Sequence, residues 1–268
     1  KRGVATLQDQ ISCSFKGFVS RLNIQEFNEP QIGLSRLEQG SLVHKILENF
    51  FNAIPSSSDL KKLPEDKLQE EINKHINSAI QLISQSNFKS IEKERLIKIV
   101  NEYIKLEKNR EYFQVIKTES ESKVDVNGLQ FSTRIDRMDK MKDGTNLIID
   151  YKTGQNVSLS QLTGDPLDQA QLPIYAITNP VAGIAFATVN SKDCQFKAIT
   201  KNKFDLPLSQ QAIKRMPVWN EQVSEWELEL NSASQKFQEG VAEVLPTSNA
   251  CDYCDYDLLC RFEKSSNN

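Results

Sequence analysis

The sequence has no apolar run that approaches the roughly 20 residues required to cross a bilayer, and it shows no signal peptide. It also has no excess of positive charge, because 36 Asp and Glu residues outweigh 33 Lys and Arg residues and leave a net charge of −3. The first absence excludes a helical membrane span. The second removes any compositional argument for a nucleic-acid partner, so a basic groove would have to be local. We expect a cytoplasmic protein with no membrane partner.

Cysteine is scarce as well, with five residues in 268, and its placement does not suit a disulfide scaffold. Three cysteines crowd into CDYCDYDLLCR near the C-terminus, at Cys251, Cys254 and Cys260, whereas Cys13 lies near the other end. In a reducing compartment such a cluster indicates a metal site before it indicates disulfides. Because the first residue is Lys1 rather than Met, we expect the sequence to be a piece of a longer protein.

The composition that remains, 38% hydrophobic and 26% charged, is typical of a soluble protein with a core. Apolar spacing predicts helices first, then alternating strands separated by turns at VNGL and KDGT, and then mixed elements. The expected helices cover 7–22, 34–54, two segments within 64–112, 168–178 and 208–240, and the expected strands cover 113–126, 129–139, 145–152 and 181–190, with one more at QFKAIT. This order predicts one α/β core of the α+β kind, with a helical insertion at 55–112.

The stretch LIIDYKTGQ, residues 147–155, places two charges at the end of a strand that is otherwise apolar. Asp150 and Lys152 are two residues apart and therefore share a face, and RIDRMD places Asp136 within reach across the hairpin. Two carboxylates bind hard divalent cations through oxygen, and a nearby Lys can position a water for attack on a phosphodiester. The competing explanation is a strand-end ion pair between Asp150 and Lys152, which the spacing alone favours.

This pattern resembles the PD-(D/E)XK nuclease superfamily, in which an Asp on one strand precedes an Asp/Glu-x-Lys on the next. Asp136 matches the first position, and Asp150 and Lys152 match the second. The resemblance implies a restriction-endonuclease-like core, with a small mixed sheet flanked by helices, and Mg²⁺- or Mn²⁺-dependent cleavage of DNA. It runs from Cys13 to Cys260 and is strongest to the RecB-family, AddB-like nuclease domains of bacterial repair proteins.

Two helical motifs belong to the same resemblance. GSLVH is similar to a Gly-x-x-x-His motif, with Gly40 and His44, and implies that His44 is a metal ligand. QLPIYA resembles a Gln-x-x-x-Tyr motif with Gln171 and Tyr175 one turn apart on one face, and implies that the pair supports Lys152 and contacts DNA. By themselves, a lone His on an amphipathic helix and a Tyr packed on a sheet are ordinary structural residues.

Other polar residues near these motifs carry weaker signals. Glu119 and Glu121 share a face of the first strand, where some relatives have an acidic residue, but solvated strand charges are the favoured interpretation. Arg134 shares a face with Asp136 and could contact phosphate. His75 has no motif around it, and we expect a solvated helix residue.

The cysteines also follow the resemblance. In AddB-like nucleases and CRISPR adaptation nucleases, one Cys before the nuclease core and a C-x2-C-x5-C after it hold a 4Fe–4S cluster that joins the chain ends. Cys13, Cys251, Cys254 and Cys260 match this order, so the resemblance implies such a cluster. On chemistry alone four thiolates suit zinc equally well, and unliganded thiols are a third explanation. Cys194 lies outside the pattern and is expected to be a plain thiol.

We therefore expect one nuclease domain over residues 1–268, with the insertion at 55–112 and the cysteine cluster at 245–262. The predicted activity is metal-dependent hydrolysis of DNA by an exonuclease domain of repair or recombination, with a helicase domain or subunit as a candidate partner. The expected ligands of Mg²⁺ or Mn²⁺ are His44, Asp136 and Asp150, and the other expected catalytic residues are Lys152, Gln171 and Tyr175. The alternative is an inactive nuclease fold that serves as a DNA-binding scaffold of a helicase–nuclease complex.

Overall fold

The computed structural model describes residues 3–22, 24, 32–83, 86–202, 206–247, 250–252 and 254–262. The predicted turn at 84–90 and the cysteine segment 245–262 each include residues outside this set. Within the described part, no helix combines the length and apolar character needed to span a membrane.

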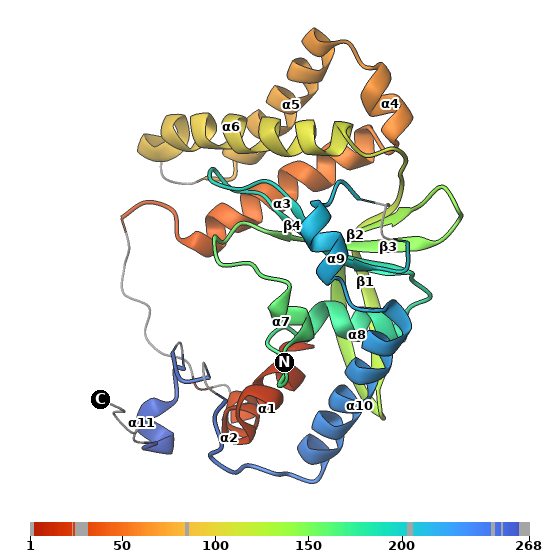
Figure 1. Cartoon of the computed structure of the whole chain (residues 1–268). Helices are drawn as coiled ribbons and strands as arrows, with labels where there is room; N and C mark the ends of the chain where they lie inside the picture. Colours follow the sequence, from red (N-terminus) through yellow and green to blue (C-terminus); the bar gives the residue numbers. More distant parts are fainter. Residues whose placement is uncertain are drawn as a thin grey trace.

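A five-stranded mixed sheet forms the centre of the fold (Figure 1). In spatial order the strands are β1 (Gln114–Val126), β2 (Leu129–Lys140), β3 (Asn146–Lys152), β4 (Gly183–Thr188) and β5 (Phe196–Thr200). Neighbouring strands are antiparallel except β3 and β4, which are parallel. The mixed sheet is confirmed, and the three strands of the predicted meander begin and end within one residue of their expected limits.

The first hairpin turns at Asn127 and Gly128, which both have positive φ, 49° and 83°. A two-residue turn with this backbone matches the twist of paired strands, and Asn-Gly tolerates it best. The turn sets the register of β1 against β2, with Val126 opposite Leu129. A local sequence signal therefore fixes which residues of the two strands face each other.

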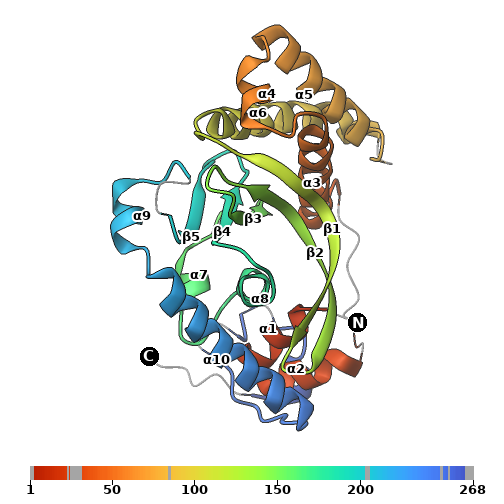
Figure 2. The ribbon, with the colours of Figure 1, turned by 90° about the vertical axis from the view of Figure 1, so that its right-hand side faces the viewer.

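Helices cover both faces of this sheet (Figures 1 and 2). Those before it are α1 (Ala5–Ser12), α2 (Ser14–Val19), α3 (Arg36–Ala53), α4 (Ser57–Lys62), α5 (Glu65–Ile80) and α6 (Lys89–Lys108). Those after β3 are α7 (Ser160–Thr163), α8 (Gln171–Thr178), α9 (Gln210–Arg215), α10 (Trp219–Gln238) and α11 (Asp257–Cys260), and two 3-10 turns, η1 (Ser20–Leu22) and η2 (Ser86–Phe88), complete the set.

The sheet separates two hydrophobic cores. On one side α3 and α6 pack on the sheet and α5 packs on these two helices, and Ile149 and Tyr151 of β3 belong to this core. On the other side α8 and α10 pack on it, and Ile148 belongs there with Phe186 of β4. Figure 2 shows α8 inside the curve of β1 and β2. Because β3 is buried on both faces, its polar end residues have restricted access to water.

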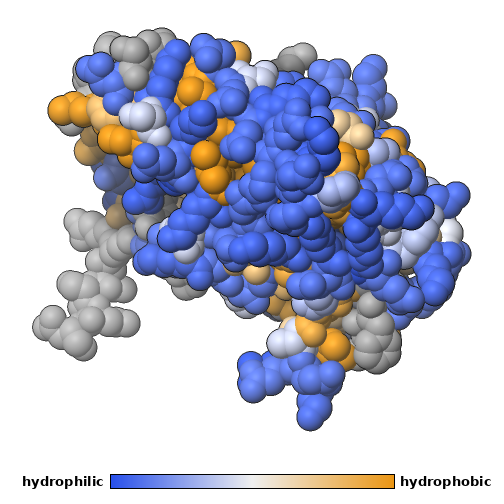
Figure 3. All heavy atoms as spheres, turned by 90° about the horizontal axis from the view of Figure 1, so that it is seen from above, coloured by the Kyte–Doolittle hydropathy of each residue, from blue (hydrophilic) through white to orange (hydrophobic). Residues whose placement is uncertain are grey.

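The helical layer is tied to the sheet by four charges that are fully buried. Arg137 and Asp139 of β2 meet Glu107 of α6 and Arg110 just beyond it. Arg137 Nη1 donates to Glu107 Oε1 at 2.9 Å, and Arg110 Nη1 donates to Asp139 Oδ2 at 2.6 Å. Two carboxylates thus neutralise two guanidinium groups, which makes the burial of all four acceptable. The opposite face of this layer, over α5 and α6, is mainly hydrophilic with smaller hydrophobic spots (Figure 3).

Three expectations about the helices were wrong. The helix over 7–22 is interrupted at Cys13, whose backbone is extended (φ −166°, ψ 120°), so α1 and α2 are separate helices. The single helix over 208–240 is two helices, α9 and α10, because Pro217 between them has no amide hydrogen and drives Met216 into an extended conformation. His75 is buried rather than solvated, with 8% exposure, a ring contact to Phe50 and its Nε2 3.4 Å from Glu71. α4, α5 and α6 do occupy the segment 55–112, but its status as a separate insertion stays a prediction.

Candidate active site

The two strand carboxylates lie opposite each other where β2 meets β3. Arg137 pairs with Ile149, so the same register places Asp136 across from Asp150. Both are buried, with 8% and 4% exposure. Asp136 Oδ2 accepts a hydrogen bond of 2.9 Å from the amide of Tyr151. The Asp136 carboxylate is therefore anchored to the main chain between Asp150 and Lys152.

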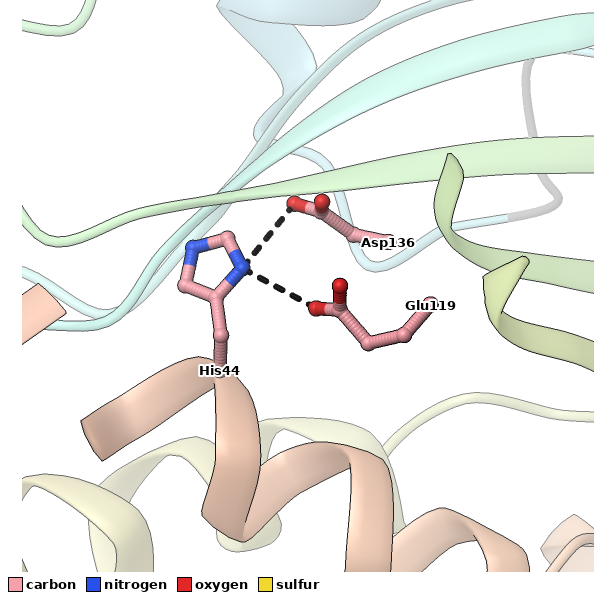
Figure 4. Close-up of side chains that lie close together, drawn as sticks. All are labelled: His44, Glu119 and Asp136. Carbon is pink, nitrogen blue, oxygen red and sulfur yellow. Dashed lines mark hydrogen bonds and ion pairs between the residues drawn. The ribbon is translucent and has the colours of Figure 1, made fainter. Parts of the chain in front are cut away.

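Helix α3 brings His44 to these strand ends. Gly40 lies one turn before it, and a Cβ at Gly40 would be 3.2 Å from Thr153 Oγ1, so glycine permits the close approach of α3 to the end of β3. His44 Nδ1 lies 3.3 Å from Glu119 Oε1 and 3.5 Å from Asp136 Oδ2 (Figure 4). In the described part of the chain, these three are the only trio of potential ligand groups whose donor atoms all lie within 4.8 Å of one another. The second nitrogen, Nε2, is 3.1 Å from the carbonyl oxygen of Tyr151.

Glu119 was misassigned from the sequence as a solvated strand charge. Its side chain is only 10% exposed, and its Oε2 forms a 2.7 Å ion pair with Arg134 Nε. The Asn-Gly turn could have identified it, because Thr118 pairs with Arg137 and Ser120 with Ile135, which leaves Glu119 opposite Asp136.

The main chain at Glu119 also departs from an ordinary strand, since its φ is 41°. A non-glycine residue in this region costs of order 1–3 kcal/mol and persists only where the surroundings enforce it. Such residues are concentrated at functional sites. Glu121, in contrast, is exposed as expected.

The electrostatics of the trio follow from burial and from carboxylate crowding. Burial, followed by the charge of Asp150, raises the pKa of Asp136 to about 7. Burial opposes protonation of His44, but its hydrogen bond to Glu119 and the charge of Asp136 outweigh this and raise its pKa. For Glu119 burial is outweighed by His44 and Arg134, which lower its pKa. A cation at this position would replace protons that Asp136 and the imidazole of His44 otherwise hold.

Lys152 and Asp150 share a face, as predicted, and form an ion pair with Nζ 2.8 Å from Oδ2. The Lys152 side chain is 28% exposed, and its ammonium lies 5.2 Å from the ring centre of Phe186. This contact agrees with the strand-end ion pair and with a catalytic pair alike. What distinguishes the site from a plain ion pair is the neighbouring trio of His44, Glu119 and Asp136.

Gln171 and Tyr175 of α8 meet each other as predicted, with Gln171 Nε2 3.3 Å from the Tyr175 hydroxyl. That hydroxyl donates to the carbonyl oxygen of Arg134 at 2.8 Å and also contacts Thr133 Oγ1. Within the described residues, no hydrogen bond joins either side chain to Lys152. The pair therefore contacts β2 just before Asp136.

An open cleft of about 710 Å³ lies over His44 and Glu119 of this trio, and we call it the active-site cleft. His44 and Glu119 reach it from below. Its rim carries Arg134 of β2, Thr153 after β3, and the α3 side chains Arg36, Lys45 and Glu48. Arg134 is 64% exposed, so a ligand that enters the cleft can contact its guanidinium.

The three cysteines of the C-x2-C-x5-C pattern, together with Cys13, are not arranged as a ligand set among the described residues. Three thiolates on one zinc ion, with bonds of about 2.3 Å, would lie about 4 Å apart, and no three of the sulfurs among the described residues approach that closely. Cys13 is buried, and the other three are half-buried: Cys251, Cys254 and Cys260. The cluster stays a prediction, and Cys194 is half-buried outside it.

The chain ends that carry these cysteines do lie together. Thr247 N donates to the carbonyl oxygen of Ser12 at 2.8 Å, and Phe15 N donates to that of Glu243 at 3.0 Å. These bonds hold the segment before the C-terminal cysteines against the junction of α1 and α2, where Cys13 lies. The backbone therefore brings residues 243–247 next to residues 12–15, and the joining of the chain ends by a cysteine cluster stays a prediction.

Of the comparisons with known proteins, the one with family models identifies a family. A search of curated proteins found no significant match. One solved protein, titled "Crystal structure of SSO0001", aligns over 96% of this chain and 94% of its own, with 15% identity and a TM-score of 0.34. The family model of the PD-(D/E)XK nuclease superfamily matches residues 4–261, nearly the whole chain. Asp136, Asp150 and Lys152 lie where two neighbouring strands meet. With this match, the chain belongs to the PD-(D/E)XK nuclease superfamily.

Proposed function

We propose that this protein hydrolyses phosphodiester bonds of DNA in a reaction that requires Mg²⁺ or Mn²⁺. The observation that supports this most directly is the convergence of His44, Glu119 and Asp136 beside the Asp150–Lys152 pair, with His44 and Glu119 lining an open cleft. A structural ion pair would not require three further ionisable groups to be buried against it, because such burial is costly.

The donor atoms suit a hard divalent cation. Carboxylate oxygens of Asp136 and Asp150, with that of Glu119 and one nitrogen of His44, are ligand types that Mg²⁺ and Mn²⁺ accept. The carbonyl oxygen of Tyr151 lies beside the imidazole and adds a neutral oxygen donor. A bound cation would polarise the scissile phosphate and offset its developing charge.

The other residues of the site position the reacting groups or supply positive charge. Lys152 holds an ammonium at the edge of the carboxylates, where it can orient the attacking water and stabilise negative charge on the phosphate. Tyr175, with Gln171 behind it, fixes the β2 main chain next to Asp136 and so supports the site indirectly. Arg134 is exposed enough to bind a phosphate.

The cysteines complete the proposal. Cys13, Cys251, Cys254 and Cys260 would hold a 4Fe–4S cluster that joins the two chain ends, with structural zinc as the chemical alternative. The hydrogen bonds between residues 243–247 and the α1–α2 junction support a shared site there. The same resemblance supports an exonuclease role in DNA repair, next to a helicase domain or subunit.

The deciding experiment measures cleavage of end-labelled single- and double-stranded DNA with Mg²⁺, Mn²⁺ or a chelator. The wild type is compared with Lys152→Ala and with Lys142→Ala, a control in the β2–β3 turn whose side chain is 74% exposed. We expect metal-dependent cleavage by the wild type and the control, and a loss of about 10²-fold or more in Lys152→Ala. Equal cleavage by all three proteins would refute the site. DNA binding without cleavage by any of them would favour the inactive scaffold instead.

A further inference from the structure

A second hollow of about 440 Å³ adjoins the active-site cleft, and we call it the distal hollow. It is lined by Arg36, Gln39, Arg95 and residues 153–156. Arg36 and Thr153 line both hollows, so the two form one continuous groove. Thr153 directly follows Lys152, which places the junction of the hollows next to the end of β3.

The two hollows differ in chemistry. The active-site cleft includes the carboxylates of Glu48 and Glu119, whereas the residues that line the distal hollow include no carboxylate. They offer two guanidinium groups, three side-chain amides, a hydroxyl and the glycine-containing loop after β3. Guanidinium, amide, hydroxyl and main-chain amide groups are the donors that bind nucleic-acid phosphates and sugars.

The guanidinium group of Arg95 is oriented by a neighbouring carboxylate. Its Nε donates to Glu92 Oε2 at 2.9 Å, and its Nη2 also contacts Glu92, whose side chain is only 6% exposed. This fixes the plane of the guanidinium, and among the described residues no acceptor binds its Nη1. The Arg95 side chain is 30% exposed toward the hollow.

The positive charge of Arg36 does not stabilise its own helix. It is the first residue of α3, where positive charge is unfavourable to the helix dipole. Within the described chain no carboxylate forms an ion pair with it, and it is exposed where the two hollows meet. A ligand with negative charge would supply the missing partner.

We propose that the distal hollow binds a phosphodiester of the DNA strand next to the scissile one, a proposal that rests on the nuclease function above. The substrate strand then lies along the whole groove. Arg95 belongs to α6, so the helical segment between α3 and β1, which has no other assigned role, forms one wall of the substrate site. Because only the backbone is contacted, this binding is independent of base sequence.

The test measures the affinity of the full chain for a fluorescent single-stranded oligonucleotide, by anisotropy in Ca²⁺, over a series of salt concentrations. The variants are Arg36→Gln and the double variant Glu92→Gln/Arg95→Gln, which removes both charges so that no buried carboxylate is left unpaired. Lys105→Gln is the control, because Lys105 lies on the same helix with a 69% exposed side chain. Melting temperatures confirm that each variant is folded.

We expect each groove variant to weaken binding about 5- to 20-fold for oligonucleotides of any sequence, and to reduce the salt slope by about 0.7 to 0.9. Lys105→Gln should bind within about twofold of the wild type. If the wild type shows Lys152-dependent cleavage but the folded groove variants bind like the control, the distal hollow is not a phosphate site, although the nuclease function stands. If the wild type neither binds nor cleaves DNA, the proposed function fails, and the distal hollow fails with it.

Discussion

The Nε2 atom of His44 lies 3.1 Å from the main-chain carbonyl oxygen of Tyr151. Tyr151 stands between Asp150 and Lys152, so this contact fixes α3 against the strand end that carries both side chains. With Nε2 facing a carbonyl and Nδ1 facing two carboxylates, the imidazole is set to carry a proton on each nitrogen. A bound cation requires the neutral ring, so metal and protons compete for this position.

We first predict that Mn²⁺ binding releases protons near neutral pH. Both His44 and Asp136 have raised pKa values, about 7 for Asp136, so each holds protons that a cation must displace. Apparent affinity should therefore rise between about pH 6 and about pH 8, and the calorimetric enthalpy should depend on the ionisation enthalpy of the buffer. A buffer-independent enthalpy would contradict this competition.

We next predict that Asp136→Asn stabilises the metal-free protein at high pH. The folded pKa of about 7 lies above the unfolded value, so the contribution of Asp136 to stability is fully present below about pH 4 and is lost as pH rises through 7. Asn can still accept the Tyr151 amide without becoming charged. At about pH 8 the variant should gain of order 1 kcal/mol, a rise of about 2–4 °C in Tm, and the gain should vanish near pH 4. Equal destabilisation at both pH values would contradict this.

The third prediction concerns Glu119, which was expected to be a solvated strand charge and instead lies beside His44. Glu119→Gln should weaken Mn²⁺ binding about tenfold or more, because it removes a carboxylate from the trio. It should also lower the pKa of His44, since the hydrogen bond that His44 donates to Glu119 is the largest influence that raises it. An NMR titration can measure the pKa of His44, because the sequence has two histidines and their signals can be told apart. Glu121→Gln, on the exposed part of β1, is the control, and identical behaviour of the two variants would remove Glu119 from the site.

The fourth prediction addresses the buried charges between α6 and β2. Glu107→Gln leaves Arg110 and Arg137 with Asp139 as their only carboxylate partner in the network. Removal of one member of a buried charge network costs about 3–5 kcal/mol, whereas the exposed pair of Glu102 with Lys105 is worth under about 1 kcal/mol. Urea unfolding of Glu107→Gln and Glu102→Gln should show this contrast, and similar losses in both would refute it.

The fifth prediction tests the cysteine cluster. If Cys254 is a cluster ligand, Cys254→Ser should lower both the bound iron and the melting temperature of protein purified without oxygen, because ligation at both chain ends contributes to folding. Cys194→Ser should change neither, since Cys194 lies outside the pattern. Zinc in place of iron would support the structural zinc alternative. Unchanged metal content and stability in Cys254→Ser would mean that the thiol binds nothing.

Much of the sheet was determined by local sequence. The alternation in β3 and the KDGT turn between β2 and β3, with Gly144 at a φ of 83°, place Asp136, Asp150 and Lys152 together because strand periodicity and turn geometry depend on neighbouring residues alone. The same holds for the i,i+4 contact between the Gln and Tyr of α8. Where a local signal was overlooked, as at Pro217, the predicted helix was wrong.

Only the tertiary structure decided the rest of the site. The register of β1 and β2 places Glu119 opposite Asp136, but its positive φ opposes local preference and is held in place by surrounding contacts. The Tyr151 carbonyl became part of the site because α3 packs across the end of β3, and Arg36 and Arg95 share a groove because α3 and α6 meet there. These contacts join residues far apart in the chain, so their positions depend on how helices pack on the sheet rather than on any pattern within one segment.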